Sequence, residues 1–244
     1  MNRYFYDMHL HSCLSPCGDN DMTPNNIVNM GLISSLDIIA LTDHNSCKNC
    51  PAAMTVAKKC GITLICGMEL CTSEEIHVIC LFDTLQNAMD FDGYVEKHIP
   101  DIQNNEQVFG QQLILDSNDN ITDKFDKLLV TATDISVTEV TKLCNDFHGA
   151  CYPAHIDKSS YSLLSQLGDI PNECGFTSYE ISARGDVAHL KERFDVLNNA
   201  PLLLSSDAHY LEDISPKRAW LELDDKTPES VIYAIKNGCK FGRG

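Results

Sequence analysis

Short apolar runs alternate with amphipathic stretches along most of the chain. Apolar runs of about four to eight residues are typical of buried strands, and such strands separated by helices indicate a parallel sheet covered by helices. The pattern predicts strands at residues 4–10, 37–42, 62–70, 76–82, 149–155, 177–182 and 201–206. It predicts helices at residues 24–30, 51–60, about 86–97, 160–166, 186–198 and 228–237. Six or seven strand–helix units in a chain of 244 residues favour an α/β barrel.

Capping residues mark several of the predicted helix ends. Thr23 and Thr227 each precede a proline, which places a capping hydroxyl before the first helical turn. Ser136 and Glu139 have the spacing of a capping box. A glycine after a helix supplies the left-handed residue that turns the chain into the next strand. Glycines of this kind precede apolar runs at Gly31, Gly61 and Gly149.

One stretch interrupts the alternation. Residues 103–127 are polar, apart from two short apolar runs on either side of residues 116–120. This composition predicts a small hairpin inserted between two barrel units. We find no clear linker, repeat or low-complexity segment, so we expect a single domain over residues 1–244 that includes this insertion.

The composition is that of a globular protein. Hydrophobic residues make up 43% of the chain, enough for a sizeable core, and no apolar run approaches the ~20 residues of a membrane-spanning helix. Asp7 and His9 stand where a signal peptide would have its apolar segment. We therefore expect a cytoplasmic protein without a membrane partner.

The 12 cysteines do not indicate a disulfide scaffold. They are about 5% of the residues, below the ~8–10% of such scaffolds, and many stand in apolar runs as small buried hydrophobes. Cys47 and Cys50 form the one CxxC pair. A redox or zinc role for this pair is the alternative to an ordinary loop before a helix, but no second pair is present to complete a structural zinc site.

The formal net charge is −17, and no run of Lys or Arg occurs. A protein that binds long nucleic acid usually has a basic face. We therefore expect no stable complex with long DNA or RNA, while a short nucleotide stays open as a substrate. The charge makes no prediction about the oligomeric state.

Histidines and carboxylates stand at nearly every predicted strand end. The first strand runs into His9 and His11, and this i, i+2 spacing puts both side chains on one face of a strand. In an α/β barrel the strand ends meet at one edge, where active sites lie. The other candidates at strand ends are Asp43, His44, Glu69, His155, Asp157, Asp207 and His209, and His77 stands near the start of its strand. Such a set, without clustered thiolates, suits Zn, Mn or Fe.

Two other classes of metal enzyme do not fit the sequence. No HEXXH string of a metalloprotease occurs. A metallo-β-lactamase would have Asp-His two residues after its HxH motif, where this chain has Cys13 and Leu14.

Taken together, the motifs resemble those of the PHP (polymerase and histidinol phosphatase) family. They are HLHS at 9–12, LTDHN at 41–45, GMEL at 67–70, EIHVICLF at 75–82, YPAHID at 152–157 and SSDAH at 205–209. Their order and spacing are similar to those of the family over most of the chain. The resemblance implies a distorted (β/α)7 TIM-like barrel that holds three divalent ions, Zn, Mn or Fe, and cleaves phosphate esters.

The resemblance also implies a set of ligands for each ion. The first ion would take His9, His11, Glu69 and Asp207, and the second would share Glu69 and add His77 and His155. The third would take His44, His209 and one residue of the loop after HLHS. Family members usually have an acid or a histidine five residues after the second histidine, where this chain has Pro16. We expect Asp19 to be the loop ligand, with Asp21 and Cys17 as alternatives.

Three more residues are expected near the reaction. Asp43 is a candidate catalytic residue that orients a ligand or receives a proton, with a structural carboxylate as the alternative. Arg184 and Lys158 follow predicted strands and are candidates for phosphate binding, with surface positions as the alternative. Bound ions would make the pocket positive inside an acidic protein, and a water bridging two ions would become a hydroxide nucleophile.

Three functions therefore remain open. The leading one is hydrolysis of a small phosphate ester, either a phosphomonoester or a nucleotide. The second is a metal-dependent amide or C–N hydrolase, but such enzymes usually bridge their metals with a carbamylated lysine, and Glu69 takes that place here. The third is a non-catalytic or proofreading module like that of bacterial replicative polymerases, against which the acidic charge and the full set of ligands argue.

Overall fold

The computed structural model describes residues 1–214 and 219–243. The strands are β1 (Asn2–Leu10), β2 (Ile38–Leu41), β3 (Thr63–Cys71), β4 (His77–Phe82), β5 (Leu113–Leu115), β6 (Ile121–Lys124), β7 (Gly149–Pro153), β8 (Tyr179–Glu180), β9 (Leu202–Leu203), β10 (Ala219–Leu223) and β11 (Phe241–Arg243). The helices are α1 (Pro24–Ile33), α2 (Cys50–Cys60), α3 (Leu85–Val95), α4 (Glu106–Phe109), α5 (Val137–Asp146), α6 (Leu163–Leu167), α7 (Val187–Arg193) and α8 (Pro228–Asn237). In this part of the chain, no helix has both the length and the apolar character needed to cross a bilayer.

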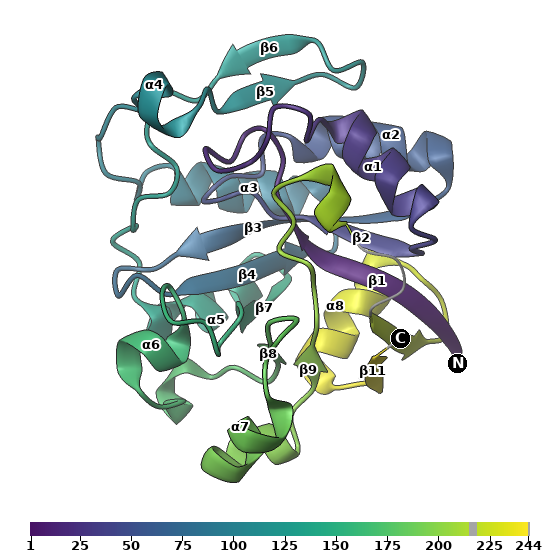
Figure 1. Ribbon diagram of the computed structural model, residues 1–244, viewed down its shortest axis with the longest axis vertical. Coiled ribbons are helices and arrows are strands. Elements are labelled where there is room, and N and C mark those ends of the chain that lie inside the picture. Colours follow the sequence, from purple (N-terminus) through teal and green to yellow (C-terminus); the bar gives the residue numbers. More distant parts are fainter. Residues whose placement is uncertain (215–218, 244) are drawn as a thin grey trace.

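A curled sheet forms the centre of the molecule, and in the view of Figure 1 α1, α2 and α3 lie above it and α5, α6 and α8 below it. Its strand order is β11-β10-β1-β2-β3-β4-β7. The parallel pair β8–β9 lies beyond β7 and returns toward β1. A bond from Ile156 N to Glu180 O connects the end of β7 to β8, and a bridge between Leu10 and Ala208 joins the segment after β9 to the end of β1. The seven predicted strands therefore follow one another around a distorted barrel, which confirms the predicted fold class.

The sheet is mixed, so the prediction of a parallel sheet is wrong in part. β1, β2 and β3 pair in parallel, whereas β4 runs antiparallel to both β3 and β7. The reason is the short connection between β3 and β4, which Thr72 N closes by donating to Ile76 O. A parallel connection needs a crossover of about a dozen residues or more. The start of β4 therefore lies at the same edge as the ends of its neighbours.

Two apolar cores lie on the two faces of the sheet. Alternate strand residues such as Ile39 and Leu64 pack in the larger core with α1, α2, α3 and α5. Their neighbours Ile38 and Ile65 pack in the inner core with residues of α8 such as Val231. This alternation explains why the strands read as continuous apolar runs, since both faces are covered.

A bulge near the end of β1 changes which side chains face inward. The register of β1 on β2 shifts between Asp7 and Leu10. Tyr6 and Met8 both belong to the inner core, so simple alternation would point His9 away from it. Leu10 instead belongs to the outer core, which shows that the extra residue reverses the alternation. The bulge thus turns His9 inward, next to the barrel interior.

The predicted helix ends are confirmed only in part. Gly61 ends α2 with a left-handed φ of 76°, and the capping box at Ser136 begins α5. Gly31 lies inside α1, where a Cβ atom would come within 3.2 Å of the side chains of Ile39 and Ile62. Gly149 begins β7, and a Cβ there would lie 2.6 Å from a backbone oxygen of β4. These last two glycines permit close packing and do not cap helices.

The insertion forms the predicted hairpin, β5–β6, preceded by the short helix α4. Asn49, which is fully buried, connects this hairpin to the loop after β1. Its Nδ2 donates to Ser12 Oγ at 2.9 Å and to Leu113 O at 3.0 Å, and its Oδ1 accepts from Leu115 N at 2.9 Å. The insertion therefore supports the loop that follows the first histidine motif.

Candidate metal centre

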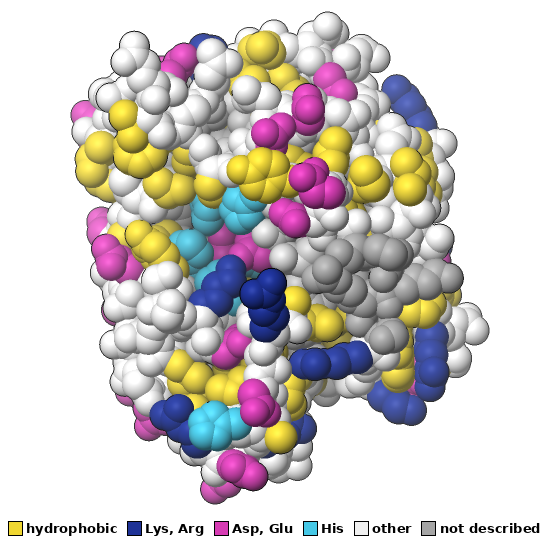
Figure 2. Space-filling model, in the orientation of Figure 1, with side chains coloured by type: hydrophobic (Ala, Val, Ile, Leu, Met, Phe, Trp, Pro, Cys, Tyr) yellow, Lys and Arg dark blue, Asp and Glu magenta, His cyan; other side chains and the backbone are white. Residues whose placement is uncertain are grey.

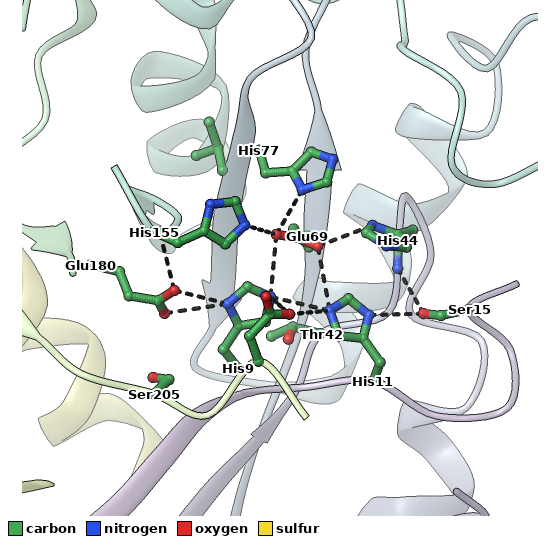
Figure 3. A network of polar contacts seen from close by, with 12 residues as sticks. His9, His11, Ser15, Thr42, His44, Glu69, His77, His155, Glu180 and Ser205 are labelled. Carbon is green, nitrogen blue, oxygen red and sulfur yellow. Dashed lines mark hydrogen bonds and ion pairs between the residues drawn. The ribbon is translucent and has the colours of Figure 1, made fainter. Parts of the chain in front are cut away.

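Side chains from six segments meet at one edge of the barrel (Figure 3). They are His9 and His11 at the end of β1, His44 after β2, Glu69 of β3, His77 of β4, His155 after β7, and Asp207 and His209 after β9. His77 is the first residue of β4, and it reaches this edge because β4 runs opposite to its neighbours. The structure thus brings together eight of the nine predicted metal ligands.

Glu69 is the centre of this cluster and is 1% exposed. Its Oε1 lies 2.9 Å from His77 Nδ1, 3.2 Å from His9 Nε2 and 3.3 Å from His155 Nε2. Its Oε2 lies 3.0 Å from His44 Nδ1 and 3.4 Å from His11 Nε2. One carboxylate thus faces five imidazoles, and each of its two oxygens is placed to bind a different ion.

Three groups of side chains have ligand atoms within 4.8 Å of one another. They are His9, His11, Glu69 and Asp207; His44, Glu69 and His77; and His11, His44 and His209. The first group is the set expected for the first ion. The second contains His44 and lacks His155, although His155 also reaches Glu69.

The expected loop ligand, Asp19, lies outside the cluster. Asp19 belongs to none of the three groups. Its carboxylate accepts a hydrogen bond from Asp21 N at 2.8 Å, and its own N–H donates to His209 O at 2.9 Å. The structure does not bring the Asp19 carboxylate into the cluster, because it turns back on its own loop, and its role as a ligand stays a prediction.

The polar atoms of the cluster fit divalent cations. His9 Nε2 and His11 Nε2 face each other at 3.1 Å, and both lie 3.2 Å from Asp207 Oδ1. Among the described residues, no hydrogen bond of good geometry satisfies the buried atoms Glu69 Oε1, His44 Nδ1 and His155 Nδ1. Buried polar groups without partners are costly, and cations bound by imidazole and carboxylate would satisfy them.

The charges of the cluster affect one another strongly. Burial would raise the pKa of Glu69, but His77, His9 and His44 outweigh it and hold that pKa well below its ordinary value. Burial would lower the pKa of His11, yet hydrogen bonds to Asp207 and Glu69 raise it to about 9. His209 lies beside His11, and burial and this neighbour lower its pKa to about 3. Without a metal, protons on some of the histidines balance the carboxylates.

A second ring of residues orients the histidines. Glu180 accepts a hydrogen bond from His9 Nδ1 at 3.0 Å, and Ser15 Oγ lies 2.9 Å from His11 Nδ1. Both contacts leave Nε2 of each ring directed at Glu69 and Asp207. Such partners fix the tautomer and the orientation of a metal-binding histidine. The sequence analysis did not select Glu180. This residue lies in the predicted strand 177–182, and an acid in a buried strand is unusual, which is the signal that could have identified it.

Asp43 has a positioning role in this geometry. Its carboxylate accepts hydrogen bonds from Ser12 N, Ser12 Oγ and Ser15 Oγ, each at 2.7 Å. Since the Ser15 hydroxyl donates to Asp43, its oxygen is free to accept from His11 Nδ1. Asp43 thus contacts the cluster through Ser15, and its expected catalytic role stays a prediction.

Backbone strain also occurs at the cluster. His155 has a φ of 28° and Asp207 a φ of 56°, in the left-handed region that non-glycine residues avoid. Such conformations cost about 1–3 kcal/mol each and persist where the surrounding structure holds them. Here the N–H of His155 donates to Glu180 Oε1 at 3.2 Å. The strain is consistent with a functional role for these two positions.

A cavity of about 160 Å³ opens at the cluster. Its lining consists of His44, Glu69, His77, His155, Lys158, Ser160, Tyr161, Asp207 and His209. The Lys158 ammonium pairs with Asp207, and the exposed Tyr161 ring stacks on His77 with 4.8 Å between centroids. Figure 2 shows histidine and acidic side chains together in this hollow, with basic side chains beside it. Arg184 is exposed on the loop between β8 and α7 and does not line the cavity.

Residues 7–168 match the PHP domain, and the chain therefore belongs to the PHP domain family. This is the family that its histidine motifs resemble. Its enzymes are metal-dependent hydrolases of phosphate ester bonds, and the clustered histidines and carboxylates of this chain provide the ligands that such chemistry needs.

Individual relatives are nucleases. A 5′-3′ exoribonuclease of Haemophilus influenzae is 34% identical over 88 residues, which are 34% of this chain and 31% of that protein. The lesion-specific endonuclease Q of Pyrococcus furiosus has a similar structure, with a TM-score of 0.71 and 19% identity over 99% of this chain and 58% of that chain. A complex of endonuclease Q with a 27-mer duplex, which has an abasic lesion at the active site, gives a TM-score of 0.65 at 18% identity. This chain thus spans well under two thirds of these relatives, and the structural likeness shows the fold.

The prediction that excluded long nucleic acid is wrong. It rested on the net charge of −17, but the same fold binds a duplex substrate in endonuclease Q. Net charge is a sum over the whole surface, whereas a phosphate group is bound by the local charge of a site. The acidity of this chain therefore excludes no class of phosphate ester.

Proposed function

We propose that this protein hydrolyses the phosphate ester bond of a nucleotide, either free or at the end of a nucleic acid strand, with divalent metal ions held by the Glu69 cluster. The observation that carries the proposal is the convergence of five imidazoles on the two oxygens of Glu69, next to a cavity. The three overlapping groups of ligand atoms are the basis for proposing up to three ions.

The residues around the cavity have different roles in the proposed reaction. Bound ions supply Lewis-acid activation of water and neutralise charge on the phosphate oxygens. His9, His11, Glu69 and Asp207 would hold one ion, and Glu69 would share a second with His44, His77 and His155. Glu180 and Ser15 keep the coordinating nitrogens of His9 and His11 directed at the ions.

Two residues at the mouth of the cavity provide contacts to substrate. Lys158 pairs with Asp207 and is 42% exposed at its side chain, so its ammonium can bind a phosphate oxygen when the ligand arrives. The ring of Tyr161 is 43% exposed and stacks on His77, which offers a surface on which a base can stack. The nuclease activities of the two relatives support a nucleotide over a sugar phosphate.

The test is a hydrolysis assay on protein reconstituted with Zn²⁺, Mn²⁺ or Fe²⁺. The substrates are nucleoside monophosphates, 5′-phosphorylated DNA and RNA oligomers, and sugar phosphates, with release of phosphate or nucleotide as the readout. We expect turnover of at least one nucleotide or oligomer and none of amide substrates. Ions bound without turnover of any phosphate ester would instead indicate a non-catalytic module.

A further inference from the structure

A group of thiols lies in the larger core, and the proposed function uses none of them. Cys80 of β4 and Cys151 of β7 stand directly opposite each other in the sheet. Their side chains belong to the same core, to which α5 contributes a third cysteine, Cys144. All three are free thiols. The structure therefore pairs two cysteines that are far apart in the sequence.

The hydrogen-bond pattern of β4 and β7 brings the paired side chains close together. Hydrogen-bonded and non-hydrogen-bonded pairs alternate along an antiparallel ladder, and side chains are closer in the non-hydrogen-bonded pairs. Ala154 N donates to His77 O at 2.9 Å, which makes this pair a hydrogen-bonded one. By the register, Cys80 and Cys151 then form a non-hydrogen-bonded pair. The Cα atoms of such a pair are about 4.5 Å apart, within the ~4.4–6.8 Å that a disulfide spans.

A cavity gives a small molecule access to one of the two thiols. It has a volume of about 160 Å³, and residues of α5, β7 and α8 line it, among them Cys151. Cys151 is 7% exposed, whereas Cys80 is completely buried. The Cys151 thiol donates to Thr141 Oγ1 at 3.6 Å, and Lys236 also lines the cavity. A polar cavity of this size is large enough for water or hydrogen peroxide.

We propose that Cys80 and Cys151 are a peroxide-sensitive thiol pair that closes to a disulfide between β4 and β7. The Cys151 thiolate attacks hydrogen peroxide, the O–O bond breaks, and a sulfenic acid and hydroxide form. The hydroxide takes up the proton that the thiol released and becomes water. The Cys80 sulfur then attacks the sulfenic sulfur, the S–S bond forms, and a second water leaves with the proton of Cys80. Two thiols are oxidised, and one peroxide is reduced to two waters.

The disulfide would join two strands that position candidate metal ligands. His77 is the first residue of β4, and His155 follows the end of β7. Oxidation would thus fix the spacing of these strands close to the metal centre. A hydrogen bond with Cys144 and burial hold the pKa of Cys151 well above its ordinary value, while Lys236 acts in the opposite direction. Since the thiolate is the reactive form, the reaction is best measured at mildly alkaline pH.

Disulfide mapping of the zinc-loaded protein tests the proposal, because zinc itself is not oxidised by peroxide. After treatment with hydrogen peroxide, the remaining thiols are alkylated in denaturant, and unreduced peptides are identified by mass spectrometry. We expect a peptide pair joined through Cys80 and Cys151 that a reductant separates. The exposed Cys17 and Cys60 show whether the oxidant was sufficient. If both have reacted while Cys80 and Cys151 are still alkylated, the proposal is overturned.

Variants separate the roles of the two thiols. Cys80→Ser should stop the reaction at the sulfenic acid of Cys151, which dimedone traps as a stable adduct. Cys151→Ser should leave Cys80 a free thiol at the same peroxide concentration. Cys144→Ser is the matched control and should keep the disulfide, whereas a bond between Cys144 and Cys151 in the unmodified chain would contradict the proposal. Circular dichroism checks folding, and none of these readouts depends on hydrolysis, so they stay valid if the proposed function fails.

Discussion

At the scale of the residue, the site depends on one carboxylate among several imidazoles. Glu69 is nearly inaccessible to water, and each of its oxygens faces at least two ring nitrogens. A buried charge in this setting is stabilised by opposite charge, from protons when no metal is present and from cations when they are bound. Glu69 is therefore the residue whose replacement should affect all the ions at once.

Replacement of Glu69 by glutamine keeps the shape and removes the charge. We expect Glu69→Gln to lower hydrolysis more than about 100-fold and to release at least one ion, because two groups of ligands share this residue. Metal content and turnover of the best substrate are the measurements. His189→Ala, on the exposed surface of α7, is the matched control and should change neither. Equal losses in both variants, with folding intact, would mean that the ligands are assigned incorrectly.

Glu180 should act through the orientation of His9. Glu180→Gln keeps an oxygen that can accept from His9 Nδ1 but loses the charge that makes the ring more basic. Such partners are worth about 10–100-fold in metal affinity. We expect zinc affinity, measured by competition with a chelator, to fall about 10-fold with Glu180→Gln and further with Glu180→Ala. Unchanged affinity in both would assign Glu180 a purely structural role.

At the scale of the element, the apolar pattern predicted the strands well, because burial on both faces makes them continuous apolar runs. It placed His9 and His11 on one face of a strand, and the structure agrees. It could not predict the bulge in β1, because an extra residue in one strand depends on pairing with another. The strands β10 and β11 were missed for the same reason, since β10 pairs with the start of β1 from the far end of the chain and β11 pairs with β10.

The loop ligand was the part of the site that the sequence could not settle. Asp19, Asp21 and Cys17 lie within five residues of one another, and spacing alone cannot distinguish them. The position of these side chains depends on the closed turn at Gly18 and on the contact of Asn49 with Ser12. These contacts connect segments that are far apart in the sequence.

Asn49 tests the support that the insertion gives to this loop. Asn49→Ala would leave Leu115 N and Leu113 O without partners. A buried polar group left unsatisfied costs about 1–3 kcal/mol, so we expect Tm to fall by several degrees. Asn198→Ala, at an exposed site, should change stability by less than about 0.5 kcal/mol. Similar Tm values for the two variants would show that the insertion does not stabilise the loop.

At the scale of the whole molecule, the net charge of the chain led to the wrong expectation about nucleic acid. The acidity of the chain was a poor guide to the phosphate esters it could accept, because under the proposed function a phosphate would meet the bound ions and Lys158 and not the average surface. The single domain over residues 1–244 stays a prediction. Composition and motif order predicted the fold class and the family, whereas the choice among phosphate esters depends on the shape and lining of the cavity.

The stability of the metal-free protein should fall as the pH rises from about 6.5 to 9. The carboxylates outweigh burial and raise the pKa values of His11 and His44 from 6.5 to about 9. A group with a raised folded-state pKa adds stability below its unfolded pKa, and this contribution is lost as the pH passes its folded pKa. We expect Tm of the metal-free protein to drop by several degrees over this range.

The metal-loaded protein should behave in the opposite way. Ions replace the protons on the histidines, and binding strengthens as histidines lose protons. Its Tm should therefore hold or rise between pH 6.5 and 9, measured by calorimetry in matched buffers. Parallel declines with and without metal would mean that the ions do not bind at these histidines.

The most direct test of the account is the location of the ions. Crystals of the zinc-loaded protein, measured on both sides of the zinc absorption edge, give an anomalous map of every bound ion. The account predicts peaks within coordination distance of Glu69, one of them shared with His9, His11 and Asp207, and another beside His44 and His209. A map with no peak at Glu69, or with zinc bound only elsewhere on the molecule, would contradict the proposed metal centre and the phosphate chemistry built on it.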